Sequence, residues 1–156
     1  LDNTNIIFTK SNSDTDGKKI NLAIDEYIVK NSSKSKGFYS LGQLNYLSIL
    51  QYVDFVIGNS SSGLLEAPSF KIGTINVGDR QRGRIKAKSV IDCLPNKKNI
   101  TNAIKQIYSS EFQKNIKKVK NPYGDGYASQ KIIKVLKTIP LQNIIKKIFY
   151  DVKFYL

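Results

Sequence analysis

The hydrophobic and polar positions of the chain follow two patterns: short continuous apolar runs, and longer segments in which apolar residues recur every three or four positions. The continuous runs predict short buried strands of a parallel sheet, at 5–9, 37–40, 53–57, 74–77 and 89–93. The helical spacing predicts helices between and after them, at 20–28, 44–50, 64 onwards, 100–107, 112–119 and 132–139. This alternation predicts an α/β fold with a Rossmann-like, doubly wound parallel sheet.

The stretch 53–84 is the part of the chain around which the other elements are arranged. Its first apolar run ends abruptly at Gly58, and Asn59, three serines and Gly63 follow before a helix opens. Pro68 lies inside that helix, so we expect the helix to be short or bent, because proline lacks an N–H and crowds the preceding turn. The strand at 74–77 then leads into a loop over 78–88 that is rich in glycine and arginine.

Ligands bind beyond the carboxyl ends of the strands in doubly wound sheets, and the serine turn lies at such an end. Ser60 and Ser61 could bind a phosphate with hydroxyls and backbone N–H groups at a helix N-terminus. The residues alone equally allow a simple serine N-cap. Glu66, one helical turn later, could accept hydrogen bonds from sugar hydroxyls, although complementing the helix dipole is the simpler interpretation.

Two further residues follow strand ends. Arg80 comes directly after the strand at 74–77, and its guanidinium group matches phosphate oxygens bidentately. Asn12 lies in the turn after the first strand and could line the same pocket, with an Asx turn as the alternative interpretation.

Composition limits the chemistry that this chain can perform. The 156 residues fit one domain, and no apolar run reaches the length of about 18 residues that a membrane span needs. His is absent and Cys93 is the single cysteine, so we expect no metal site, no cofactor, no internal disulfide and no His-based catalytic triad.

The N-terminus lacks the features of a secretion signal, which predicts a cytoplasmic location. A chain that begins with Leu1 and lacks Met also suggests a piece of a longer protein.

The net charge of +13 lies entirely in residues 61–156, because the charges of residues 1–60 cancel. A strongly basic half of the chain allows the interpretation that the protein is a non-enzymatic module that binds nucleic acid. Such a module should lose affinity steeply with salt. Lysine-rich helices are commonly just solvated faces, and the aromatic residues are not interleaved with the cations as a strand-binding surface requires. We therefore expect no nucleic-acid partner, and the arginines near residue 80 favour a small anionic ligand.

Three ordered motifs carry a family resemblance: G-N-S-S-S-G-L-L-E-A-P-S-F at 58–70, T-I-N-V-G-D-R-Q-R-G-R at 74–84 and N-P-Y-G-D-G-Y-A at 121–128. Together they resemble the hydrolysing UDP-N-acetylglucosamine 2-epimerases, especially the bacterial branch that makes N-acetylmannosamine for sialic acid synthesis. The resemblance implies a GT-B architecture of two Rossmann-like domains, of which this chain is the C-terminal one. Residues 1–139 would form the UDP-binding domain, incomplete at its N-terminus, and residues 140–156 an amphipathic C-terminal tail.

By motif position, the resemblance implies that Ser60 and Ser61 hold the diphosphate and that Glu66 binds the ribose hydroxyls. Arg80 and Asn12 would be further UDP contacts, and the backbone near Leu41 would read uracil. The implied ligand is UDP-N-acetylglucosamine or UDP. The implied protein partners are the missing N-terminal domain and further copies of the chain.

The family eliminates UDP to form a glycal intermediate and then adds water with inversion at C2. The carboxylates for this chemistry lie mainly in the N-terminal domain, so no catalytic residue is assigned here and the chain alone is expected to be inactive. The alternative is the donor-nucleotide domain of a GT-B glycosyltransferase, whose partner domain would supply an acceptor base instead.

Overall fold

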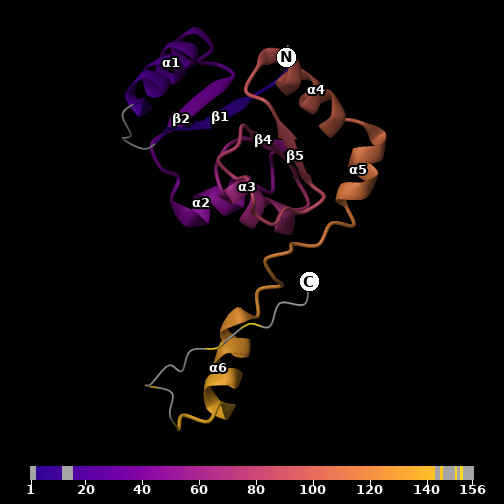
Figure 1. Cartoon of the computed structure of the whole chain (residues 1–156). Helices are drawn as coiled ribbons and strands as arrows, with labels where there is room; N and C mark the ends of the chain where they lie inside the picture. The colour runs from indigo at the N-terminus through magenta and orange to yellow at the C-terminus, as the bar shows by residue number, and fades with distance from the viewer. Residues whose placement is uncertain (1–2, 12–15, 143–144, 146–149, 151, 153–156) are drawn as a thin grey trace.

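The computed structural model describes residues 3–11, 16–142, 145, 150 and 152, and within them the strands form two parallel sheets. In the first sheet, β1 (Ile6–Thr9) pairs with β2 (Ser35–Phe38). In the second, β4 (Gly73–Val77) lies between β3 (Phe55–Gly58) and β5 (Val90–Cys93). Helices join β1 to β2, β2 to β3 and β3 to β4, whereas a loop without a helix joins β4 to β5 (Figure 1).

The first sheet is joined by α1 (Gly17–Lys30) and followed by α2 (Gly42–Ile49). α1 packs so closely on β2 that Gly37 has no room for a side chain. A Cβ atom added there would lie only 2.5 Å from Cδ1 of Ile28. α1 is longer than the helix predicted at 20–28, and Asn31 is its C-cap. Tyr39 lies just beyond β2 and is 78% exposed, with its ring 4.2 Å from the ammonium group of Lys10.

The core lies in the second sheet. Ile75 of β4 is completely buried against Ala103 and Ile107 of α4 (Lys97–Ile107), and α5 (Ser110–Ile116) continues the same layer. The side chains of Asn96 and Ser109 cap these two helices by accepting hydrogen bonds from backbone N–H groups of the first turn. The central strand is therefore anchored by apolar packing, which fixes the loops at its carboxyl end.

The connection from β3 to β4 is broken into two short helical turns. α3 (Ser62–Leu65) ends just before the 3₁₀ helix η1 (Ala67–Phe70), which contains Pro68. This confirms the short, interrupted helix expected from that proline. Lys71 then adopts a left-handed conformation, with φ of 58°, that turns the chain into β4.

The last helix, α6 (Ala128–Thr138), lies apart from the two sheets and is joined to them by an extended segment (Figure 1). None of its residues is buried by the described part of the chain, and four apolar side chains are between 51% and 64% exposed: Ile132, Ile133, Val135 and Leu136. Most of the tail expected at 140–156 lies outside the described residues. No helix in the described ranges has both the length and the apolar character needed to cross a bilayer.

The predicted α/β class with parallel strands is confirmed. One strand expected at 37–40 is found two residues earlier, at Ser35–Phe38, because Ser35 to Phe38 are the residues that pair with β1. The strands are hydrogen-bonded as a pair and a triplet rather than as one continuous ladder among the described residues. The apolar pattern identifies the strands but does not determine which of them pair.

Candidate functional site

Two loops leave the second sheet side by side at its carboxyl edge. β3 and β4 are adjacent and parallel, with Gly58 opposite Asn76, so the serine turn (residues 59–61) and the arginine loop (residues 78–84) begin as neighbours. Gly58 and Gly78 have φ of 152° and 80°, which favour glycine, and they turn the chain out of each strand. The structure thus brings Ser60, Ser61 and Arg80 to adjacent loops at the edge where α/β folds bind ligands.

The serine turn leaves hydroxyl groups available. Ser60 is exposed and Ser61 is half-buried. Ser61 occupies the N-cap of α3, but within the described residues its side chain makes no capping hydrogen bond to the helix. Its carbonyl oxygen instead accepts bonds from the N–H groups of Leu64 and Leu65, both at 2.9 Å. The simple serine N-cap is therefore not what the structure shows for Ser61.

α3 contains only four residues, so its dipole can contribute little to anion binding. Anion binding at this turn would have to rest on its hydroxyls and local N–H groups. Ser60 Oγ accepts a long hydrogen bond from the N–H of Ser62, at 3.4 Å. The side chain of Ser62 is occupied by a hydrogen bond with the hydroxyl of Tyr46.

Tyr46 joins α2 to the serine turn through that hydrogen bond, and sequence reasoning did not identify it. Burial raises the pKa of Tyr46; the hydrogen bond with Ser62 opposes this, and the negative charge of Glu66 raises the pKa further. Glu66 is half-buried, and its charge acts on the tyrosine that is hydrogen-bonded to Ser62. Leu41 is half-buried at the N-cap of α2, so the expected uracil-reading backbone lies on the helix that contacts this turn.

The arginine loop is anchored by a residue between two exposed arginines. Arg80 and Arg82 are exposed, whereas Gln81 is buried and its Nε2 donates a 2.7 Å hydrogen bond to the carbonyl oxygen of Asn59. Sequence reasoning passed over Gln81, because a glutamine among arginines in a loop gives no signal of burial.

A second polar group lies at the ends of β4 and β5. Asp92 accepts hydrogen bonds from Asn76 Nδ2 at 2.7 Å and from Lys86 Nζ at 2.7 and 2.9 Å. Burial acts to raise the pKa of Asp92, but the hydrogen bonds from Lys86 and Asn76 outweigh it, so the pKa is lowered. The carboxylate is therefore held in its charged form.

An open cavity of about 440 Å³ adjoins this group, lined by Gly78, Asp79, Asp92, Cys93, Leu94 and Pro95. Burial and the charge of Asp92 raise the pKa of Cys93, so its thiol remains protonated and is a poor nucleophile. The cavity borders the arginine loop, but Ser60, Ser61, Glu66 and Arg80 do not line it in the described structure.

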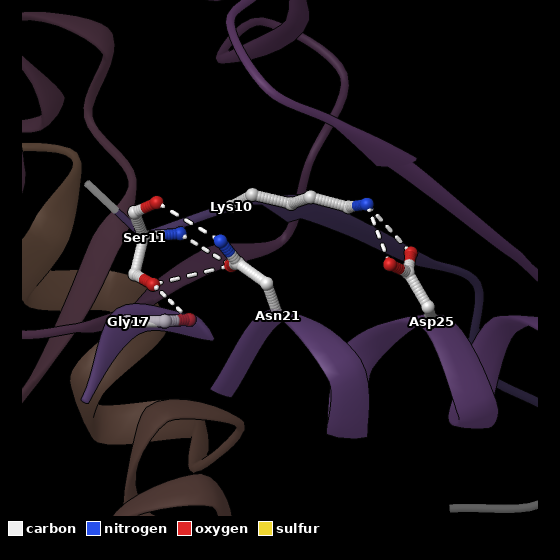
Figure 2. Close-up of polar contacts among 5 residues, drawn as sticks. All are labelled: Lys10, Ser11, Gly17, Asn21 and Asp25. Atoms are coloured by element: carbon white, nitrogen blue, oxygen red, sulfur yellow. Dashed lines mark hydrogen bonds and ion pairs between the residues drawn. The ribbon is translucent and has the colours of Figure 1, made fainter. Parts of the chain in front are cut away.

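Asn12 lies outside the described residues, but the chain is well anchored just before it. Figure 2 shows Ser11 held by Asn21: the N–H of Ser11 donates to Asn21 Oδ1 at 2.9 Å, and Asn21 Nδ2 donates to the carbonyl oxygen of Ser11 at 3.2 Å. In the same view Lys10 forms an ion pair with Asp25, and the hydrogen bond between them raises the pKa of Lys10. Ser11 is thus held in place by α1.

The third motif, at 121–128, connects two parts of the site. Asn121 Nδ2 donates to the carbonyl oxygen of Leu65 at 2.7 Å and to Ser69 Oγ at 2.8 Å, which ties the motif to α3 and η1. The hydroxyl of Tyr123 donates a 2.9 Å hydrogen bond to the carbonyl oxygen of Ile85, which lies just beyond the arginine loop. Sequence reasoning recognised this turn without finding its role, which the structure shows to be that of a clamp.

Comparison with known proteins identifies the family of this chain. A family model described as UDP-N-acetylglucosamine 2-epimerase matches residues 1–137. The chain is 44% identical over 152 residues to the GDP/UDP-N,N'-diacetylbacillosamine 2-epimerase (hydrolyzing) of Campylobacter jejuni, a match that covers 97% of this chain and 39% of the relative. It is 37% identical over 147 residues to the polysialic acid biosynthesis protein P7 of Escherichia coli, covering 94% of this chain and 37% of that protein.

A solved structure shares the fold. The crystal structure, at 2.2 Å, of a Listeria monocytogenes protein provisionally assigned as a UDP-N-acetylglucosamine 2-epimerase matches all of this chain and 40% of its own chain, with a TM-score of 0.67 at 18% identity. That similarity confirms the predicted fold class, part of a GT-B architecture. The chain spans less than half the length of each of these relatives.

Proposed function

The chain belongs to the UDP-N-acetylglucosamine 2-epimerase family, and on this basis we propose that it is the UDP-sugar-binding, C-terminal domain of a hydrolysing member. Residues 1–139 form the nucleotide-binding unit, and residues 140–156 a C-terminal tail. The name of the Campylobacter jejuni relative, which includes "hydrolyzing", supports this type of reaction. The share of each relative that the chain spans supports a partner domain elsewhere in the complete enzyme.

The observation that carries the proposal is the pair of loops at the carboxyl ends of β3 and β4. Ser60 and Ser61 offer hydroxyls to one phosphate group, and Arg80 offers a planar fork of N–H donors from the neighbouring loop. Diphosphate is negatively charged, which suits hydroxyl and guanidinium donors on two adjacent loops. Glu66 accepts hydrogen bonds from the ribose hydroxyls, and the backbone near Leu41 contacts uracil.

In the reaction we propose, the C1–O bond to UDP breaks as a proton leaves C2, and water then adds to the glycal with inversion at C2. This domain stabilises the negative charge that develops on the departing UDP, through Arg80 and the serine hydroxyls on the two adjacent loops. The groups that move protons at C2 belong to the other domain. The 156-residue chain therefore binds the nucleotide without epimerising the sugar.

The sugar that fits this proposal is a UDP-linked 2-acetamido sugar. N-acetylglucosamine and N,N'-diacetylbacillosamine, which occur in the names of the family and of the Campylobacter jejuni relative, share the acetamido group at C2. Family membership favours this reaction over the donor domain of a GT-B glycosyltransferase.

Isothermal titration of UDP into the chain tests the proposal. We expect saturation at one nucleotide per chain, and affinity at least about tenfold weaker in the Ser60→Ala, Ser61→Ala double variant. Ser129→Ala, an exposed serine on α6, is the control and should bind as the wild type does. Equal affinity in the double variant, or no saturable binding by the wild type, would contradict the proposal. Affinity for nucleic acid that falls steeply with salt would favour the alternative module.

A further inference from the structure

Gln81 is buried in a place where its neighbours are exposed. It lies between Arg80 and Arg82, yet only 3% of its surface is accessible. Its Nε2 donates to the carbonyl oxygen of Asn59 at 2.7 Å, the short end of the range for such bonds. The bond joins residues 22 positions apart in sequence and connects the arginine loop directly to the serine turn.

Fold stability does not explain why this residue is a glutamine. The Oε1 atom of Gln81 is buried and accepts no hydrogen bond from any described residue. A buried amide oxygen without a partner costs free energy, and an apolar side chain of similar length would avoid that cost. An apolar side chain could not donate a hydrogen bond to the carbonyl oxygen of Asn59. The amide of Gln81 therefore contributes the hydrogen bond between the two loops rather than better packing.

The sheet by itself does not hold the two loops in register. The paired part of β3 and β4 ends at Gly58 and Asn76, and the glycines at 58 and 78 turn both segments out of their strands. Beyond that point the side chain of Gln81 reaches across from one loop to the other. The atom that it holds belongs to the residue just before Ser60, and Gln81 itself comes just after Arg80.

We propose that Gln81 is a positioning residue: it fixes the serine turn relative to Arg80 at the spacing that a nucleoside diphosphate requires. This inference rests on the proposed function, because it concerns the same site. Holding both loops before the ligand arrives means that less conformational entropy is lost on binding. Gln81 does not touch the ligand, and acts through Asn59 and the backbone that leads to Ser60.

The test uses Gln81→Met, which keeps the length of the side chain and removes the donor. Gln113→Met is the matched control, because Gln113 Nε2 also donates a 2.7 Å bond to a backbone carbonyl, that of Ile107, on another part of the fold. We expect Gln81→Met to melt at or above the wild-type temperature, since the unpaired oxygen is lost as well. Its affinity for UDP should fall about tenfold, the effect of one hydrogen bond, while the control binds as the wild type does.

Amide hydrogen exchange without ligand provides an independent readout. Exchange at residues 59–62 should become faster in Gln81→Met and remain unchanged in Gln113→Met. Wild-type affinity in a folded Gln81→Met, or unchanged exchange at 59–62, would overturn the positioning role. If the wild type does not bind UDP, the proposed function fails, whereas the exchange comparison still decides whether Gln81 holds the turn. If Gln81→Met does not fold, Gln81→Leu, which also lacks a hydrogen-bond donor and has a smaller apolar side chain, serves in the same comparison.

Discussion

Thr74 of β4 donates a 2.8 Å hydrogen bond from Oγ1 to the carbonyl oxygen of Gly63, and its Cγ2 methyl group occupies the space where a side chain at position 63 would lie. Both residues are buried. The helical turn after the serines is therefore seated directly on the central strand of the core. Because Gly63 has no side chain, the helix and the strand can come into close contact. This contact also fixes the location of Ser60 and Ser61, which directly precede the helix.

Gly63→Ala should destabilise the fold by about 1–3 kcal/mol, the usual effect of overpacking a core. A Cβ atom at position 63 would lie 2.5 Å from Thr74 Cγ2, and the buried strand leaves little room to move. Urea unfolding would measure the loss. The double variant Gly63→Ala, Thr74→Ser should recover part of it, because serine lacks the methyl group and keeps the hydroxyl. Losses that simply add in the double variant would show that the contact is not the cause.

Tyr123→Phe should loosen the segment that directly follows the arginine loop. The change removes the hydroxyl that donates to the carbonyl oxygen of Ile85, while the ring remains in place. We expect a loss of stability of about 0.5–1.5 kcal/mol and faster amide exchange at residues 82–86. Tyr52→Phe, at an exposed tyrosine, is the control. Equal exchange rates in the two variants would contradict the clamp role of the 121–128 motif.

The ion pair between Asp92 and Lys86 should make stability depend on pH at the acidic end. The pKa of Asp92 is lowered in the folded chain, so the folded state binds the proton less readily than the unfolded state does. The stabilisation is present above the ordinary carboxyl pKa of about 3.9 and is lost as the pH falls through the lower, folded value. Because Asp92 is half-exposed, we expect less than about 1 kcal/mol.

Comparison of the wild type with Asp92→Asn measures this effect. The free energies of unfolding of the two proteins should differ at pH 7 and converge as the pH falls below the lowered pKa of Asp92. A difference that stays constant with pH would point to packing or to the Asn76 hydrogen bond rather than to the charge of Asp92.

Removal of α6 should leave the body of the chain intact. No residue of this helix is buried by the described part of the chain, so a truncation after residue 127 should keep the melting temperature of the full chain. A truncation after residue 120 also removes Asn121 and Tyr123 and should melt lower, because their hydrogen bonds to Leu65 and Ile85 are lost. A lower melting temperature for the first truncation would contradict this expectation and show that residues 128–156 stabilise the body of the chain.

The features that sequence reasoning found are those encoded locally. The strand ends, the break at Pro68 and the serine turn depend on residues adjacent in the chain. The structure has them close to where the pattern predicts, apart from the strand expected at 37–40, which is found at Ser35–Phe38. The family resemblance, carried by three motifs in order, is confirmed by the family model over residues 1–137. The roles of Ser60, Ser61, Glu66, Arg80, Asn12 and Leu41 in binding UDP stay predictions.

The features that the sequence did not predict are hydrogen bonds between residues far apart in the chain. Gln81 with Asn59, Asn76 with Asp92, and Asn121 with Leu65 are 22, 16 and 56 positions apart. Each depends on which strands pair and on how a loop folds back, and neither residue of a pair indicates its partner. Gly63 was a different case: the residue was noticed, but only the position of Thr74 explains it.

The most direct measurement is a heteronuclear NMR titration of the ¹⁵N-labelled chain with UDP. The central claim is that the nucleotide's diphosphate lies between the serine turn and the arginine loop. It predicts shifts in the amide signals of residues 59–62 and 79–81 that saturate together at one UDP per chain. Shifts confined to other parts of the chain, or none at these residues at saturating UDP, would contradict it.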